Sequence, residues 1–246
     1  WLQKAALATV LRSSPRCSVA SSRPCLKWCA APLWTPRDPT DRLGTRVEWL
    51  RSRLESFVHD CFADTYGANV SQFMPELLGL CQNGELQAGV GMRGGASGPL
   101  FLEHYLDQPV CDAIRQHTDL PVHRERVVEV GNLAALAPGA GRLLIIALTH
   151  YLATSGYTWV VFTGTPMLLN SFQRLTLSPI DLGPADPLRL GEARLEWGSY
   201  YATQPRVMAG YIPEGFNQLQ RRGLFERMRY QPDYLQTGSE IANDCA

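Results

Sequence analysis

Early in the chain, apolar residues recur among polar ones with the spacing of a helix. Over residues 46–62 the apolar side chains recur every three or four positions, which places them on one face of a helix. They are Val47, Leu50, Leu54, Phe57, Val58 and Cys61. Thr45 is a suitable N-cap and Gly67 a suitable C-terminal signal, so the pattern predicts an amphipathic helix between them.

Strand patterns follow this helix. Residues 77–81 and 86–92 are apolar runs on either side of Asn83-Gly84, a dipeptide that strongly favours a two-residue hairpin. Residues 101–116 have a helical pattern that Pro109 is expected to split.

The stretch from Arg126 to Tyr157 is the most informative part of the chain. A β-branched run over 126–136 leads through a glycine-containing turn into an apolar helix over 141–154. Free backbone N–H groups and the helix dipole meet where such a helix begins, and both favour an anion. We therefore expect a phosphate-bearing ligand at this turn.

The remaining pattern predicts a strand over 157–163, a helix over 166–177, a loop over 179–191, and a hairpin made of 194–202 and 206–212. A strand–helix–strand unit implies a parallel pair with a right-handed crossover, whereas hairpins imply antiparallel strands. The expected fold class is α+β (α/β), a mixed twisted sheet with helices on both faces.

Composition narrows the choice of function. The 246 residues carry a formal net charge of zero, which argues against nucleic acid and anionic membrane surfaces as partners. No apolar run is long enough to predict a transmembrane segment. The seven cysteines are scattered, and Cys25 with Cys29 lacks the further ligands of a zinc site, so we expect no metal and a reducing, cytoplasmic location.

The two ends of the chain differ from its centre. Residues 1–37 contain basic residues and no Asp or Glu, which is typical of a disordered or transit-like leader. We therefore expect a leader over 1–44, one folded domain over 45–215, and a polar C-terminal tail over 216–246.

Several short segments together resemble the thermostable hemolysin family and, more broadly, the GCN5-related N-acetyltransferase fold. They span roughly residues 46–210 and are FMPELL (73–78), FLEHYLD (101–107), VVEVGNLAA (127–135), VFTGT (161–165), NSFQRL (170–175), ADPLRL (185–190) and WGSYY (197–201). The family name implies membrane lysis, whereas the fold implies acyl transfer.

The resemblance implies a site for an acyl thioester, either acyl-CoA or the acyl-phosphopantetheine of an acyl carrier protein. In this fold a bulged central strand pairs with the pantetheine arm, and the pattern Q/R-x-x-G-x-G/A holds the pyrophosphate. The matching residues are Leu133 and Ala135 on the strand, Gly139, Ala140, Gly141 and Arg142 at the turn, and Asn170 near the thiol. Leu136 stands where the pattern has Gln or Arg, and Arg142 could partly compensate by contacting phosphate.

Acid–base chemistry has two candidates. A carboxylate on a buried strand is costly unless it is paired or used, and burial would raise the pKa of Glu129 towards that of a general base. The alternative for Glu129 is an ion pair with Arg93, Arg124 or Arg126. Tyr201 could protonate a departing thiolate as general acid, or be only a pocket wall.

Four residues are candidates for binding a small acceptor. Arg93 and Arg124 could hold an acceptor carboxylate by paired hydrogen bonds. Asn132 offers a donor and an acceptor, which suits either a substrate or a strand bulge. Trp197 belongs to an aromatic cluster that could form the wall of the site.

The sequence thus favours an acyltransferase that moves an acyl group from a thioester to a small amine or hydroxyl acceptor. No G-x-S-x-G motif supports a lipase-like route to lysis. Two alternatives remain: a hemolysin that perturbs membranes directly, and a non-catalytic binding module with the same fold. Direct perturbation would require a helix able to leave the core, and the strongly apolar helix lies between two strands.

Overall fold

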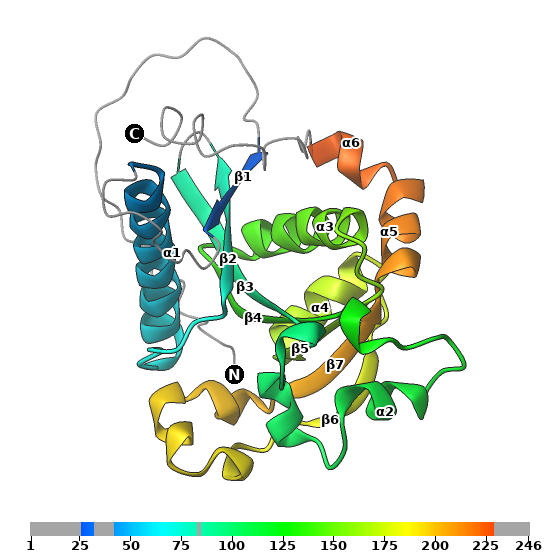
Figure 1. The fold of residues 1–246 in the computed structure, drawn as a ribbon. Helices are drawn as coiled ribbons and strands as arrows, with labels where there is room; N and C mark the ends of the chain where they lie inside the picture. Colours follow the sequence, from blue (N-terminus) through cyan, green and yellow to red (C-terminus); the bar gives the residue numbers. More distant parts are fainter. Residues whose placement is uncertain (1–25, 32–41, 83–84, 229–246) are drawn as a thin grey trace, which may run out of the picture.

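A computed structural model describes residues 26–31, 42–82 and 85–228 of the chain. Its centre is a seven-stranded sheet in the order β1-β2-β3-β4-β5-β7-β6 (Figure 1). The strands are β1 (Leu26–Ala31), β2 (Glu76–Gln82), β3 (Glu85–Gly94), β4 (Val127–Ala135), β5 (Trp159–Gly164), β6 (Ile180–Pro184) and β7 (Arg206–Tyr211). The β4–β5 pair is parallel and the other pairs are antiparallel, so the expected mixed sheet is confirmed.

Helices cover both faces of this sheet. The α-helices are α1 (Arg42–Tyr66), α2 (Val110–Arg115), α3 (Pro138–Thr154), α4 (Pro166–Arg174), α5 (Ile212–Arg221) and α6 (Leu224–Met228). Short 3-10 helices are η1 (Gly95–Ser97), η2 (Phe101–Tyr105), η3 (Arg124–Arg126), η4 (Pro187–Trp197) and η5 (Tyr200–Thr203). The main core packs α3, α4, α5 and α6 on one face, whereas α1, η2 and α2 pack on the other.

A bulge in β4 reverses which side chains face which layer. Val128 and Val130 point into the α3 core, and beyond the bulge Leu133 and Ala135 do so instead. The β3–β4 register shifts between Gly89 and Gly91, and Asn132 has a φ of +50°. An extra residue in one strand produces this change of face. The bulge that the resemblance implied at the end of the central strand is therefore present.

Both ends of the domain extend further than the composition suggested. Leu26–Ala31, placed in the leader from sequence, is an edge strand paired with β2, and Trp28 is only 1% exposed against α3. Leu219 and Met228, placed in the polar tail, are buried in the same core. The rest of the expected leader and tail, and the Asn83-Gly84 turn, lie outside the described residues.

Local expectations were correct at some boundaries and wrong at others. Pro109 separates η2 from α2 as expected. Thr45 lies inside α1 and is therefore not its N-cap. The predicted strand 194–202 is wrong: these residues fall in η4 and η5, and Gly198 between them adopts a φ of +51°, which interrupts an extended strand. The partner of β7 on this side is β6, inside the expected loop.

Candidate functional site

The sheet opens between β4 and β5. These strands pair only from Val127 to Val130, opposite Trp159 to Phe162. Beyond Val130, the register partners of β4 in the described sheet lie on β3 alone. Leu133 and Ala135 therefore have a backbone edge turned towards the gap, as a ligand that adds to a strand requires.

Helix α3 begins at this gap. Its first residue is Pro138, earlier than the sequence suggested, so Gly139, Ala140 and Gly141 form its first turn. Ala137 at the N-cap supplies no side-chain hydrogen bond, and the first turn contains no acidic residue. The amides of residues 139 and 140 are therefore left for a ligand, and the helix dipole adds positive potential.

The turn is also sterically open. Gly139 is exposed, and a Cβ atom added there would meet nothing within 4 Å. At Gly141 an added Cβ would touch only the Cβ of Ala135, at 3.8 Å. Arg142 directly follows this turn on α3. Leu136, which stands where the acyltransferase pattern has Gln or Arg, is 56% exposed. This open turn has room for a pyrophosphate group.

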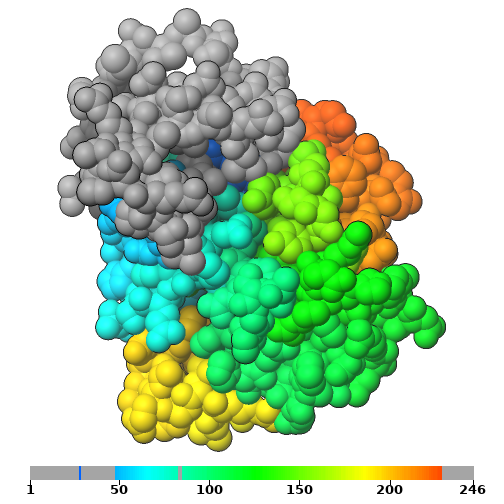
Figure 2. Space-filling model, in the orientation of Figure 1, coloured from blue at the N-terminus to red at the C-terminus, as the bar shows by residue number. Residues whose placement is uncertain are grey.

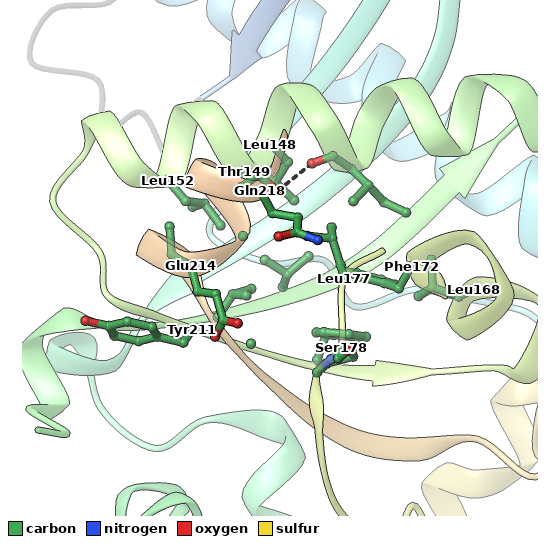
Figure 3. A pocket seen from close by; sticks show the side chains of 18 of the residues that line it. Leu148, Thr149, Leu152, Leu168, Phe172, Leu177, Ser178, Tyr211, Glu214 and Gln218 are labelled. Carbon is green, nitrogen blue, oxygen red and sulfur yellow. Dashed lines mark hydrogen bonds between the residues drawn. The ribbon is translucent and has the colours of Figure 1, made fainter. Parts of the chain in front are cut away.

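A cavity of about 270 Å³ adjoins the gap on the α3 side (Figure 3). Val130 and Leu133 of β4 and Phe162 of β5 line its end at the gap. Helices α3, α4 and α5 contribute its other walls, and Glu214 and Gln218 are the polar lining residues from α5.

The sequence did not identify this cavity. Asn170, expected near the thiol, is exposed on α4 and does not line it, whereas Leu168 and Phe172 do. Phe172 stacks on Phe162 with ring centroids 5.0 Å apart. The apolar i, i+4 spacing of Leu168 and Phe172 was the available signal, because such pairs mark the buried face of a helix.

Glu129 lies on the other face of the sheet and is 2% exposed. Its two carboxylate oxygens accept hydrogen bonds of 2.8 Å from the backbone amides of Phe101 and Leu102. Burial raises the pKa of Glu129, although these amides and the charge of Arg93 oppose the rise. The carboxylate thus anchors η2 to the central strand, and its raised pKa suits a base.

The guanidinium of Arg124 makes more hydrogen bonds within the protein than that of Arg93. Arg124 forms a two-point ion pair with Glu103 and donates to the carbonyl oxygens of Gly95 and Gly98. These bonds hold the η1–η2 connection and use the groups that were expected to bind an acceptor. Arg93 lies opposite Glu129 in the β3–β4 register and donates to the Pro99 carbonyl oxygen at 3.3 Å.

Burial alone would raise the pKa of Glu103. Hydrogen bonds from Arg124 and from the backbone amides of Val110 and Leu100 outweigh this effect and lower the pKa to about 2. Glu103 is therefore a charged group with a structural role, because it binds the amides of Leu100 and Val110 on either side of η2.

Aromatic side chains gather beyond η2 on the face of Glu129. The hydroxyls of Tyr105 and Tyr201 are 2.5 Å apart, and Trp197 contacts both Phe101 and Tyr201. Burial raises the pKa of Tyr201 to about 12, although the hydrogen bond with Tyr105 opposes the rise. The segment 187–203 that carries Trp197 and Tyr201 lies against the end of α1 (Figure 2).

Asn132 connects the bulge to the segment before β2. Its side-chain oxygen accepts a 2.8 Å hydrogen bond from the Met74 amide, and its nitrogen donates to the Gln72 carbonyl oxygen at 3.4 Å. Met74 covers Gly131 so closely that an added Cβ there would lie 2.6 Å from its Cε. These contacts fit the bulge interpretation of Asn132.

The expected site residues thus form two groups on opposite faces of the sheet. Leu133, Ala135 and residues 139–142 lie with the cavity on the α3 side. Glu129, Arg93, Trp197 and Tyr201 lie on the η2 side. The open end of the β4–β5 pair is where the two groups can meet.

Comparisons with known proteins agree with this fold. A family model described as thermostable hemolysin matches residues 45–216. TofI in a ternary complex with an inhibitor and MTA is similar over 85% of this chain and 99% of its own, at 12% identity and a TM-score of 0.52. BjaI, a CoA-dependent acyl-homoserine lactone synthase with SAM and isopentyl-CoA, is similar over 82% and 90%, at 14% identity and a TM-score of 0.50.

No curated protein matches the chain in sequence. Among the described helices, none is long and apolar enough to cross a membrane. The expectation of an acyltransferase-like fold is confirmed by the structural likenesses, which at such low identity concern the fold alone.

Proposed function

Because the chain belongs to the thermostable hemolysin family and has a GCN5-related N-acetyltransferase-like fold, we propose that it is an acyltransferase acting on thioesters. It would move an acyl group to a small amine or hydroxyl acceptor. The observation that carries this proposal is the uncapped N-terminus of α3, which opens directly onto the unpaired edge of β4.

The donor side is proposed as follows. The amides of Gly139 and Ala140, on the first turn that contains Gly141, would hold the phosphates, and Arg142 would add a positive charge. The backbone of Leu133 and Ala135 would pair with the pantetheine amides. Acyl-CoA and a carrier-bound phosphopantetheine share this chemistry. BjaI, which is CoA-dependent, makes CoA the first donor to test.

The acceptor side is proposed on the η2 face. Arg93 would hold an acceptor carboxylate, and Asn132 and Trp197 would border the acceptor. The attacking nitrogen or oxygen bonds to the thioester carbon as the C–S bond breaks. Glu129 would take the proton of the nucleophile, and the departing thiolate would take the proton of Tyr201. Burial keeps Tyr201 protonated at neutral pH. The proton taken up by Glu129 would then return to the phenolate, which restores both groups.

We also place the reaction in the cytoplasm. Within the part of the chain that the structure describes, Cys61 and Cys111 carry free thiols, which suits a reducing compartment.

Two measurements on the purified full chain test the proposal. Calorimetry would measure the binding of CoA and acyl-CoA, and dye release from liposomes would measure membrane damage. Binding without leakage supports the enzyme, and leakage without binding supports a membrane-acting hemolysin. A folded protein that does neither would support the non-catalytic binding module and overturn the proposal.

A further inference from the structure

We infer that the cavity under α3 receives the hydrocarbon chain of the donor, so that the preferred donor carries a medium or long acyl chain and not an acetyl group. This inference rests on the proposed function and specifies its substrate class. Three features of the cavity support it: its position, its walls and its rim.

The position of the cavity places a chain where the thioester would lie. Leu133, whose backbone edge faces the gap, also contributes to the cavity, together with Val130 and Phe162 from the last paired residues of β4 and β5. An acyl carbon held at the gap could therefore extend its chain directly over β5, beneath α3, without crossing a packed layer.

The walls favour an apolar occupant. The inner surface is formed by side chains such as Ile145, Leu148, Leu152, Val160, Leu168 and Phe172. Polar residues also line the cavity, but the hydroxyls of Thr149 and Thr176 and the amide nitrogen of Gln218 already donate hydrogen bonds to backbone carbonyl oxygens. A saturated chain brings no polar group of its own into this space and would contact the apolar side chains.

The rim indicates the direction of the chain. Among the described residues that line the cavity, Glu214 is the one that is charged, and it lies on α5 with Gln218. Helix α5 follows Tyr211, which pairs with Trp159 at the beginning of β5, whereas the gap lies at the other end of that strand. A carboxylate at that end disfavours entry of a fatty acid with its own carboxylate leading. The methyl end of the chain would therefore point towards α5 and the thioester end would remain at the gap.

A series of donors tests the inference. Calorimetry with acetyl-, butyryl-, hexanoyl-, octanoyl- and decanoyl-CoA should show affinity rising roughly fourfold for each methylene that enters the cavity. The rise should stop when the chain fills the space.

Filling the cavity provides the matched variants. Thr149→Phe on α3 would place a ring in the cavity, and Thr154→Phe is its control. Both threonines donate a hydroxyl hydrogen bond to the carbonyl of residue i−4, but Thr154 is exposed and outside the cavity. Thr149→Phe should weaken decanoyl-CoA binding by roughly 60-fold, the loss of about three methylenes, and leave acetyl-CoA binding unchanged.

A second variant that fills the cavity keeps the test valid if Thr149→Phe fails to fold. A Cβ added at Gly215 of α5 would meet Leu177 and Thr149 at 3.6 and 3.8 Å, which are ordinary contacts, so Gly215→Leu would enter the cavity from α5 instead of α3. It should shorten the preferred chain in the same way.

The outcomes separate this inference from the function on which it rests. Thioester binding that is independent of chain length, or unchanged in both filling variants, would overturn the inference and leave the acyltransferase proposal in place. Failure of the folded protein to bind any thioester would overturn both. A chain-length preference that both filling variants shorten and Thr154→Phe retains is the expected result.

Discussion

The side-chain oxygen of Asn132 accepts a 2.8 Å hydrogen bond from the backbone amide of Met74, 58 residues earlier in the chain. This bond fixes the segment before β2 against the bulge of β4. It is possible because Asn132 adopts a φ of +50°, a conformation that Asn tolerates better than most residues.

Two substitutions at Asn132 should separate the hydrogen bond from the backbone conformation. Asn132→Ala leaves the buried Met74 amide unpaired and also forces a Cβ-bearing residue into positive φ, so we expect a loss of about 2–4 kcal/mol. Asn132→Gly loses the same bond but adopts positive φ freely, and should cost less. Urea unfolding measures both, and a glycine variant less stable than the alanine variant would contradict the explanation.

Glu129→Gln should reduce both turnover and stability. The substitution replaces one acceptor oxygen with an NH₂ group that faces the amide of Phe101 or Leu102, at a cost of about 1–3 kcal/mol. Turnover per folded molecule should also fall by roughly 100-fold or more if Glu129 is the base. Binding of the thioester should persist, because the donor lies on the α3 side.

Glu103→Gln is the matched control for Glu129→Gln. Glu103 also accepts two backbone amides, from Leu100 and Val110, and also fixes η2, but it does not lie on β4. It should lose comparable stability and retain turnover per folded molecule. Equal loss of turnover in the two variants would assign Glu129 to positioning η2 and remove it as the base.

A negative charge at the start of α3 should compete with the phosphates of the donor. Gly139→Asp should weaken CoA binding by about tenfold, because like charges a few ångströms apart repel by about 1–4 kcal/mol. Gly139→Asn, of the same size and uncharged, should bind nearly as the natural chain does. Calorimetry at low and high salt should show the gap between the two variants narrowing as salt rises. The new Asp favours the helix itself, so unfolding would not explain weaker binding.

The Glu103–Arg124 pair should make stability fall in acid. The pKa of Glu103 is about 2 in the folded chain and 4.5 in its ordinary state, so its stabilising effect is complete above about pH 4.5 and is lost as the pH falls towards 2. Glu129 has a raised pKa, and its effect has the opposite sign: it favours the fold at low pH and is lost as the pH rises through its folded value.

Urea unfolding across this range should separate the two groups. The acid slope should flatten in Glu103→Gln, which cannot titrate, and should remain in Glu129→Gln. An equally steep acid loss in Glu103→Gln would assign the slope to other carboxylates.

The centre of the fold could be predicted from the sequence because its signals are local. Apolar runs mark β3, β4 and β5, and the glycines after β4 mark the beginning of α3. The burial of Glu129 followed from its place within the run Val127–Val130. Its partners did not follow, because a sequence shows arginines but not which backbone amides a 3-10 turn will present.

The edges of the fold could not be predicted in the same way. Strand β1 lies in a segment whose composition is typical of a leader, and it is stabilised by pairing with residues about 50 positions later. The cavity depends on α5, in which Ile212, Phe216 and Leu219 have helical spacing within a mostly polar stretch. Such elements acquire their stability from tertiary contacts, which propensity alone does not report.

A cavity large enough for a long acyl chain suggests why the family is called a hemolysin. A long chain joined to a small polar head is a detergent, and detergents open red blood cells without any protein entering the bilayer. Under the proposed function, a product of this kind would account for the lysis that the family name implies. The lytic product would pass through a dialysis membrane, and its formation would require a supply of thioester. Lytic activity that stayed with the retained protein would contradict this hypothesis.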